Sequence, residues 1–196
     1  PIDNLTYKMI TGTNRLELVT DASNDYQSKL GDFKYDPNTK TSIDYVYDLN
    51  GNLTVDNNKK ISSISYNHLN LPGSITVTAK GNIAYTYDAA GNKIKKLTTD
   101  NSVAGKIITT TTTYIGGMVY ESKTTNPPNT PDDNYTDRLQ FISQEEGRIR
   151  FKKNPGTTTT GLFEYDYMLK DHLGNVRMVL TEETQTDMYP AATMET

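Results

Sequence analysis

Hydrophobic and polar residues alternate with a period of two along much of this chain. In the clearest run, Ile83, Tyr85 and Tyr87 alternate with Ala and Thr. Side chains of a strand point alternately to its two faces, so this period predicts strands with one covered face. The same alternation recurs at Leu53 and Val55, Ile75 and Val77, Tyr165 to Leu169, and Val176 to Leu180. The threonine run 109–113 also favours a strand, and no stretch has a helical stripe of useful length.

A turn signal separates several of these runs. The pattern Asp-x-x-Gly-Asn occurs at 48–52, 88–92 and 171–175, and a degenerate copy starts at Asn67. The Asp carboxylate is expected to cap a type I turn, while the Gly takes the left-handed conformation that closes a bulged hairpin. The degenerate copy lacks both the Asp and the plain Gly, so its turn is less defined. A Gly91→Val change is expected to cost about 1–2 kcal/mol or more, because a β-branched residue would occupy left-handed geometry.

The turns repeat at a regular distance. Tyrosine precedes the first two turns directly, and Tyr47, Tyr66 and Tyr87 are separated by 19 and 21 residues (47 to 66, 66 to 87). A period near 20 residues is typical of a supersecondary unit that covers its apolar face by stacking on its neighbours. The sequence therefore predicts an all-β fold of stacked antiparallel β-hairpins.

Two segments are expected to interrupt the array as exposed loops. Residues 126–133 contain three prolines, which remove backbone donors from a strand ladder. Residues 153–160 contain Pro-Gly followed by four threonines. Strand-like sequence resumes beyond each loop, so both are interpreted as excursions from one sheet system rather than as linkers between domains.

The composition indicates an open rather than a compact β structure. Only 34% of the 196 residues are hydrophobic, and 14 Tyr stand against four Phe and no Trp. A tyrosine ring buries a large area while its hydroxyl stays hydrated or paired, which suits a sheet with one face near water or a wide cavity. The composition therefore favours an elongated or hollow architecture.

Charge and cysteine content exclude several classes of function. The net charge of -4 gives no basic footprint for nucleic acid, and the lysine cluster 93–96 is expected to be the solvent face of a strand. The absence of Cys excludes disulfides, thiol catalysis and Cys-based zinc sites. No apolar run approaches the length of a membrane span. The chain opens Pro1-Ile2-Asp3 without Met or a signal-peptide pattern, which favours a segment from a longer polypeptide.

Several motifs resemble those of Rhs proteins. Segments 47–53 and 87–93 resemble the tyrosine-aspartate (YD) repeats of that family. Segment 170–177, Lys-Asp-His-Leu-Gly-Asn-Val-Arg, resembles the Asp-His-Leu-Gly-Asn-Val-Arg signature of the Rhs-associated core. Three flanking segments resemble those of Bacteroidetes members, at 114–117, 139–141 and 145–148. The resemblance spans residues 44 to 182, and the combination of repeats with the core signature is highly specific.

The resemblance implies a strip of β-hairpins that forms part of a spiralling hollow β-shell. It assigns residues 1–182 to the shell, with repeats clearest at 44–98 and the core motif at 165–180. Residues 183–196 are then the start of a downstream core. The family's core typically continues into a Tyr-Pro-Phe-Gly stretch, whereas this chain reads Met-Tyr-Pro-Ala-Ala at 188–192. The self-cleavage residues of some family members are therefore not carried over to this chain.

The implied function is structural. Family shells enclose and deliver a variable C-terminal segment, often a toxin, and the shell itself is not catalytic. The implied partners are the protein's own C-terminal cargo domain and the rest of a larger shell, with secretion machinery or surface glycans as further partners. The implied location is secreted or at the cell surface, with no nucleic acid, membrane span or cofactor involved.

Two alternatives stay open. The first is a cell-surface adhesin or carbohydrate-binding module, in which exposed tyrosines stack on sugars. The second is an enzyme that uses Asp171 and His172, and Glu164, Asp166 and Arg177 lie near them in the sequence. Adjacent residues of a strand face opposite sides, so an Asp171–His172 hydrogen bond is disfavoured. A turn cap at Asp171 and a turn residue at His172 are the favoured roles.

Other chemical patterns also favour structural roles. Asp48, Asn50, Asn52 and Asp56 resemble a calcium loop only in part, because Gly is fourth and position twelve is Lys59. The remaining candidates lack the required spacing or context, namely His68 in the degenerate turn, the adjacent carboxylates 132–133 and 145–146, and Gly116-Gly117. No Ser lies in a nucleophile elbow. The sequence therefore predicts no catalytic, cofactor-binding or metal-ligating residue.

A cut strip of hairpins is expected to behave poorly in solution. Both of its ends expose strands whose backbone donors and acceptors are unpaired, and such edges recruit other strands. Residues 1–196 in isolation are therefore expected to aggregate or to pair with a partner edge.

Overall fold

The computed structural model describes residues 3–23, 33, 42–128, 134–154 and 161–182, which form strands and turns and no helix. The all-β prediction is confirmed. Parts of several sequence predictions lie outside the described residues, namely 129–133 with its Asp132-Asp133 pair, 155–160, and 183–196 with the segment 188–192.

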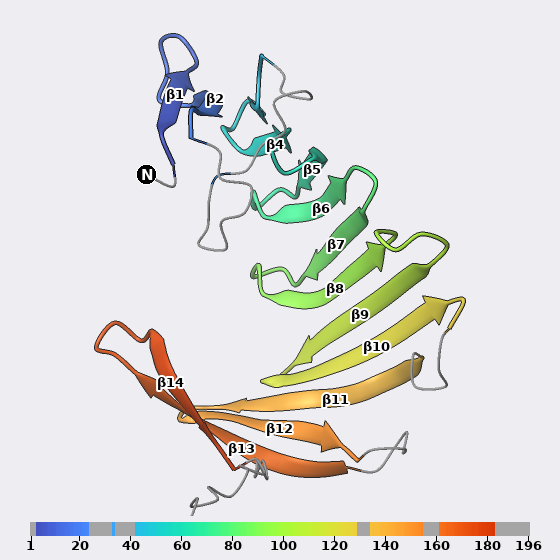
Figure 1. Ribbon diagram of the computed structural model, residues 1–196. Helices are drawn as coiled ribbons and strands as arrows, with labels where there is room; N and C mark the ends of the chain where they lie inside the picture. The colour runs from blue at the N-terminus through green and yellow to red at the C-terminus, as the bar shows by residue number, and fades with distance from the viewer. Residues whose placement is uncertain (1–2, 24–32, 34–41, 129–133, 155–160, 183–196) are drawn as a thin grey trace, which may run out of the picture. The chain divides into compact units, whose positions relative to one another are not determined.

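The described residues form fourteen strands (Figure 1). Most are four to ten residues long, the ordinary range for globular proteins. The strands are β1 (Leu5–Met9), β2 (Leu16–Asp21), β3 (Tyr45–Tyr47), β4 (Leu53–Asp56), β5 (Ile61–Tyr66), β6 (Pro72–Val77), β7 (Gly81–Tyr87), β8 (Lys93–Asp100), β9 (Ile107–Ile115), β10 (Met118–Asn126), β11 (Tyr135–Gln144), β12 (Gly147–Lys153), β13 (Gly161–Lys170) and β14 (Val176–Thr181). The threonine run 109–113 lies in β9, as predicted.

Strand order in space follows strand order in the sequence. Strands β1 and β2 form a two-stranded sheet, and β3 to β14 are hydrogen-bonded to their neighbours in sequence order. Neighbours such as β5–β6, β6–β7 and β7–β8 are antiparallel. Antiparallel neighbours need only short turns between them and no crossover. The prediction of stacked antiparallel hairpins is confirmed.

The chain divides into two compact units. Unit 1 comprises residues 1–112 and 123–134, and unit 2 comprises residues 113–122 and 135–196. The long hairpin β9–β10 contributes residues to both units. The assignment of residues 1–182 to one shell segment stays a prediction.

Unit 1 has an apolar face across β5–β8. The strand register places Ile64, Ile75, Ile83 and Thr98 in one row, so their side chains share a face. All four residues are half-buried. We call this surface the isoleucine face. Tyr85 and Tyr87 belong to it because they lie two and four residues after Ile83 on β7, and every second side chain of a strand points to the same face.

The opposite face of the same strands is polar. The adjacent row consists of Ser63, Thr76, Asn82 and Thr99. The first three of these residues are exposed. The predicted alternation is therefore confirmed in β5–β7, where the row of isoleucines is less exposed than the polar row.

The lysine cluster of β8 divides between these two faces. Lys96 lies opposite Tyr85 and Lys93 opposite Tyr87, whereas Lys95 lies opposite Thr86. The predicted strand is confirmed, and residues 93–95 are exposed, but the cluster divides between two faces instead of forming one. The reason is that side chains alternate along β8 and a bulge beside Tyr87 brings Lys93 to the isoleucine face.

On β13, in unit 2, the apolar face is the exposed one. Tyr165, Tyr167 and Leu169 of β13 are 38%, 44% and 51% exposed, whereas Asp166 between them is 3% exposed. The prediction that this alternation marks a covered apolar face is therefore wrong. The physical reason lies on the polar face, where two arginines of β12, Arg148 and Arg150, cover the Asp166 carboxylate.

The described residues contain very little sealed hydrophobic core. Val19 and Val119 are their only buried hydrophobic residues. Burial of apolar surface is normally the main favourable contribution to folding. These hairpins therefore depend strongly on backbone ladders and on contacts between successive hairpins.

Candidate functional site

The Asp88 turn has the predicted geometry. The Asp88 Oδ1 atom accepts hydrogen bonds from the backbone N–H groups of Asn92 (2.8 Å) and Ala90 (2.9 Å), while Oδ2 accepts one from Asn92 Nδ2 (2.9 Å). Gly91 has φ +86°, and the ladder register shifts at Tyr87, which marks the bulge. The Asp side chain therefore caps the turn, and Gly closes it.

The other copies form the same turn. The Oδ1 atoms of Asp48 and Asp171 accept the backbone N–H of Asn52 (2.8 Å) and Asn175 (2.9 Å), respectively. Gly51 and Gly174 both have positive φ, at +87° and +84°.

The degenerate turn substitutes amides for the missing groups. Asn67 Oδ1 accepts hydrogen bonds from the N–H groups of Leu69 (2.9 Å) and Leu71 (3.0 Å). Asn70 stands where the other copies have Gly and takes φ +56°. Asn adopts left-handed geometry more readily than other residues with a side chain. The turn that the sequence left less defined is therefore formed.

Successive turns also contact one another. The Nδ2 groups of Asn50 and Asn52 both donate to Asn70 Oδ1 at 3.0 Å. A Cβ atom at Gly91 would lie 3.2 Å from Leu71 Cδ1 and 3.5 Å from Leu69 Cδ1. The three turns of β3–β8 are thus packed side by side.

The residue directly before each turn forms a side-chain hydrogen bond to the preceding hairpin. The hydroxyl of Tyr66 donates to the Leu53 carbonyl at 2.7 Å, and that of Tyr87 donates to the Pro72 carbonyl at 2.9 Å. These two acceptors occupy equivalent positions, each five residues after the first residue of its turn. We call such side chains tethers.

The first and last turns have tethers as well. The Tyr47 hydroxyl donates to the Leu16 carbonyl at 3.0 Å. At the last turn Lys170 replaces the tyrosine, and its Nζ donates to the Glu145 carbonyl at 3.1 Å. Every one of these four turns therefore has a side-chain donor, immediately before it, that reaches a backbone carbonyl of the preceding hairpin.

The carboxylates of the three Asp turns accept hydrogen bonds that favour their ionised form. Hydrogen bonds from Asn92 lower the pKa of Asp88, and those from Asn52 and Asn175 lower the pKa of Asp48 and Asp171. A general base near neutral pH needs a pKa closer to that pH. These three carboxylates are thus suited to capping and poorly suited to proton transfer.

Asp171 pairs with Arg177 and not with His172. The Arg177 guanidinium approaches Asp171 Oδ2 at 2.8 Å, with the Nε hydrogen bond at 2.9 Å. His172 is an exposed turn residue. The favoured interpretation of Asp171 as a turn cap and His172 as a turn residue is confirmed, and Glu164 and Asp166 lie in a separate cluster.

That cluster is the strongest electrostatic feature of unit 2. Asp166 Oδ2 accepts hydrogen bonds from Nε of Arg148 (2.8 Å) and Arg150 (3.1 Å), and Arg150 also approaches Glu164 at 3.4 Å. Hydrogen bonds from Arg150 and then Arg148 hold the pKa of Asp166 well below its usual range. Sequence reasoning missed this cluster. Its signal is an Arg-x-Arg segment at 148–150 paired with a Glu-x-Asp segment at 164–166.

The opposite side of β13 presents aromatic rings. The rings of Tyr165 and Tyr167 are stacked, with centroids 6.1 Å apart and planes at 15°. Phe163 packs on Phe151 of β12 at 5.5 Å. Three of these four side chains are more than one third exposed, namely Phe163, Tyr165 and Tyr167.

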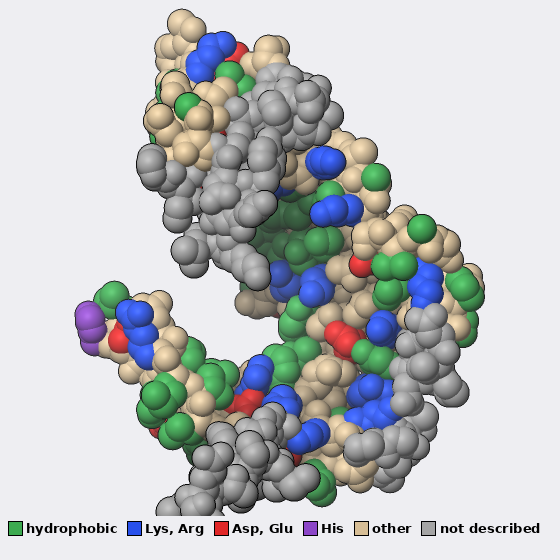
Figure 2. Space-filling model, viewed as in Figure 1, with side chains coloured by type: hydrophobic (Ala, Val, Ile, Leu, Met, Phe, Trp, Pro, Cys, Tyr) green, Lys and Arg blue, Asp and Glu red, His purple; other side chains and the backbone are tan. Residues whose placement is uncertain are grey.

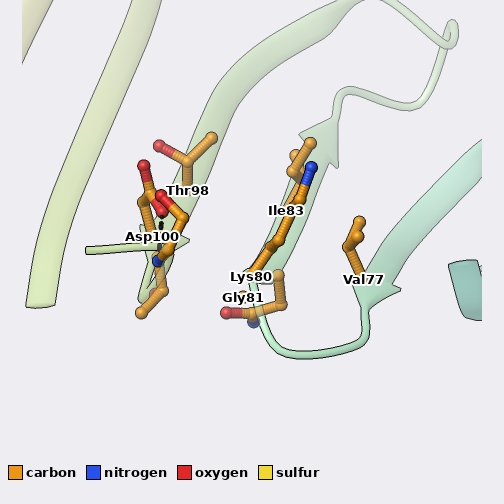
Figure 3. Close-up of a pocket in the computed structure, with 9 residues that line it drawn as sticks. Val77, Lys80, Gly81, Ile83, Thr98 and Asp100 are labelled. Carbon is orange, nitrogen blue, oxygen red and sulfur yellow. Dashed lines mark hydrogen bonds between the residues drawn. The ribbon is translucent and has the colours of Figure 1, made fainter. Parts of the chain in front are cut away.

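A cavity of about 410 Å³ opens on unit 1 (Figure 3). Figure 3 shows Ile83 and Lys80 between Val77 on one side and Thr98 and Asp100 on the other. Its remaining lining residues are Gly81, Asn82, Thr99 and Ser102. Hydrogen bonds from Ser102, together with the nearby charge of Lys80, lower the pKa of Asp100. The cavity thus combines an apolar floor with one cation and one carboxylate.

The described part of the chain contains no group of three or more His, Asp or Glu residues placed to hold a metal ion. Within the same residues, no helix has the length and apolarity to cross a membrane.

Comparison with known proteins leaves the family open. No protein-family model matches the chain, and no curated protein matches it at a significant level. The resemblance to Rhs proteins therefore rests on the motifs at 47–53, 87–93 and 170–177.

Proposed function

We propose that this chain is a structural segment of an Rhs-type shell that encloses and delivers a C-terminal, toxin-like cargo. In this proposal the shell wall is a spiral of hairpins, and its partners are the cargo domain and the remaining shell. The protein acts outside the cell that makes it, secreted or held at the surface. Its contribution is enclosure, and the wall itself catalyses no reaction.

The tethers are the observation that supports this proposal best. A wall must keep its hairpins in register over a long distance without a thick core behind them. The hydroxyls of Tyr47, Tyr66 and Tyr87 and the ammonium of Lys170 each fix one hairpin to the one before it. A hydrogen bond of this kind contributes about 1 kcal/mol, and a repeated set adds up along the strip. Such a device suits a continuous wall rather than a single pocket.

The structural partners of four described carboxylates also favour enclosure over catalysis. The carboxylates at Asp48, Asp88 and Asp171 cap turns, and Asp166 is neutralised by Arg148 and Arg150. Each of these groups has a structural partner. Residues with such partners give a wall that is chemically inert toward its contents.

Limited proteolysis of the natural, full-length protein tests the proposal. We expect the downstream cargo segment to be cut far more slowly than the same segment expressed alone. Cleavage at equal rates would refute enclosure. A His172→Ala variant serves as the second arm, and the proposal expects its processing and toxicity to be unchanged. Loss of either activity in that variant would instead support an enzymatic role.

The exposed rings of β13 favour one second candidate, a carbohydrate-binding surface. Stacked, exposed tyrosines such as Tyr165 and Tyr167 offer the flat apolar surface on which sugar rings pack. A glycan array with the wild-type chain and a Tyr165→Ala/Tyr167→Ala variant tests it. Binding that disappears in the variant supports an adhesin, and an array without signal removes this candidate.

A further inference from the structure

A glycine in the isoleucine face accounts for the cavity of unit 1. Val77, Gly81 and Asp100 are register partners on β6, β7 and β8, so they form one row across this face. Gly81 has φ +133°, and a Cβ atom there would collide with the Thr99 carbonyl oxygen. Only glycine fits this position, so the middle of the row carries no side chain. The cavity therefore opens over Gly81, between Val77 and Asp100 (Figure 3).

The backbone holds a lysine at this cavity. Lys80 lies in the turn between β6 and β7, where its N–H donates to the Val77 carbonyl at 3.1 Å and its carbonyl accepts the Asn101 N–H at 2.7 Å. Its side chain lies beside Ile83 in Figure 3. Figure 2 shows hydrophobic side chains gathered over these hairpins, with Lys or Arg side chains beside them. A cation therefore adjoins the apolar wall that Val77 and Ile83 form.

A carboxylate lines the same cavity. Asp100 Oδ1 accepts the Ser102 N–H at 2.8 Å, and Thr98 lies next to Asp100 in Figure 3. Hydrogen bonds from Ser102 lower the pKa of Asp100, and the charge of Lys80 lowers it further. Within the described residues, however, no ion pair joins Lys80 to Asp100. Two opposite charges therefore line one cavity without direct contact between them.

We propose that this cavity binds an apolar α-amino acid such as leucine. The ammonium of the ligand pairs with Asp100, and its carboxylate pairs with Lys80. Its side chain packs on Val77 and Ile83. The cavity volume of about 410 Å³ lies in the range of small-ligand sites and leaves room for such a side chain. This proposal goes beyond the proposed function, because enclosure of a cargo does not depend on it.

The pair of charges favours a zwitterion over other small apolar ligands. At neutral pH an amino acid carries both an ammonium and a carboxylate. A simple amine would be repelled by Lys80, and a simple carboxylate would be repelled by Asp100. A neutral apolar molecule would displace water from both charges without replacing its hydrogen bonds. Only a ligand with both charges satisfies both side chains.

Ligand-observed saturation-transfer NMR on the 196-residue chain tests the proposal, since it detects weak binding at low protein concentration. Leucine is titrated beside isopentylamine, which lacks its carboxylate, and isocaproate, which lacks its ammonium. We expect leucine to bind with a Kd of about 1–10 mM, because solvent reaches both charges. Each analogue is expected to bind at least about threefold more weakly. No binding of leucine, or equal affinity of the three ligands, would overturn the proposal.

Two variants separate the roles of the two charges. Lys80→Gln is expected to abolish the preference for leucine over isopentylamine, and Asp100→Asn the preference for leucine over isocaproate. Lys95→Gln, on the polar face of β8, is the control and is expected to change leucine affinity by less than about twofold. Each preference is a ratio measured on one variant, so general loss of folding does not mimic a selective change. Unchanged preferences in Lys80→Gln and Asp100→Asn would contradict the assignment.

Discussion

Two tyrosines of unit 1, Tyr66 and Tyr87, and two of unit 2, Tyr165 and Tyr167, occupy similar strands but have opposite surroundings. In unit 1, Tyr66 and Tyr87 are half-buried, and their hydroxyls tether one hairpin to the next. In unit 2, Tyr165 and Tyr167 are exposed and make no such contact with another described residue, while Lys170 serves as the tether. The contrast shows that the residue before the turn, rather than the tyrosine itself, links successive hairpins.

The covered faces of the two units are held by different interactions. Unit 1 covers isoleucines, whereas unit 2 covers the Asp166 carboxylate with Arg148 and Arg150. A charge that is buried and paired stabilises a structure only while its partners remain. The two units should therefore respond differently to loss of a single charge.

The largest expected effect comes from Asp166→Ala. Removing this carboxylate leaves Arg148 and Arg150 side by side without the buried acceptor that they share, and we expect the free energy of unfolding of β12–β14 to fall by about 2–3 kcal/mol. Hydrogen exchange of the amides in these strands measures it. Glu146→Ala removes a carboxylate from an exposed turn of the same unit and is the control. Equal exchange in both variants would show that the Asp166 cluster is unimportant.

Two glycine substitutions compare the turns of the two units. Gly91→Val and Gly174→Val both place a β-branched residue at positive φ, which costs about 1–2 kcal/mol. Only at Gly91 do Leu69 and Leu71 lie within contact of the new side chain, because nothing lies within 4 Å at Gly174. We therefore expect Gly91→Val to be the more destabilising in urea unfolding. The opposite order would contradict the side-by-side packing of the unit 1 turns.

The tethers themselves are tested by removing one hydroxyl. Tyr87→Phe deletes the hydrogen bond to the Pro72 carbonyl and is expected to cost about 1 kcal/mol. Tyr167→Phe removes an exposed hydroxyl and is expected to change stability by less than about 0.5 kcal/mol. Thermal unfolding of the two variants in parallel gives the comparison. Indistinguishable variants would mean that the tether does not stabilise the hairpin.

The smallest effect is a difference in pH dependence between neighbouring turns. The pKa of Asp88 is lowered by Asn92, so the contribution of this cap is present above the unfolded pKa and is lost as the pH falls through the lower folded pKa. Asn67 does not titrate, and its turn should keep its geometry in acid. The NMR shifts of the Asn92 and Leu71 amides report the two turns. Parallel shifts of both amides below about pH 4 would contradict the capping role of the carboxylate.

Turn chemistry was the part of the fold that could be predicted from the sequence. The Asp-x-x-Gly-Asn pattern contains both the capping carboxylate and the residue that tolerates positive φ, so local sequence determines the turn. At Asn67 the same shape arises from amides, which a search for Asp and Gly misses. Element type and turn position are local properties, and they were predicted for that reason.

The covered face of β13 could not be predicted in the same way. A period of two identifies two faces but not which one is covered, since that depends on the paired strand. Asp166 is buried because β12 places Arg148 and Arg150 beside it. The tether at Lys170 and the cavity beside Ile83 likewise depend on contacts between hairpins, which single-strand patterns do not contain.

The most direct test of enclosure combines protease protection with loss of the tethers. Cleavage of the cargo segment is measured in the natural, full-length protein and in its Tyr66→Phe/Tyr87→Phe variant, with Tyr165→Phe/Tyr167→Phe as the control. The account predicts slow cleavage in the wild type and the control, and faster cleavage in the tether variant. Cargo cut at the rate of the free segment in the wild-type protein would contradict the claim that this chain forms an enclosing wall.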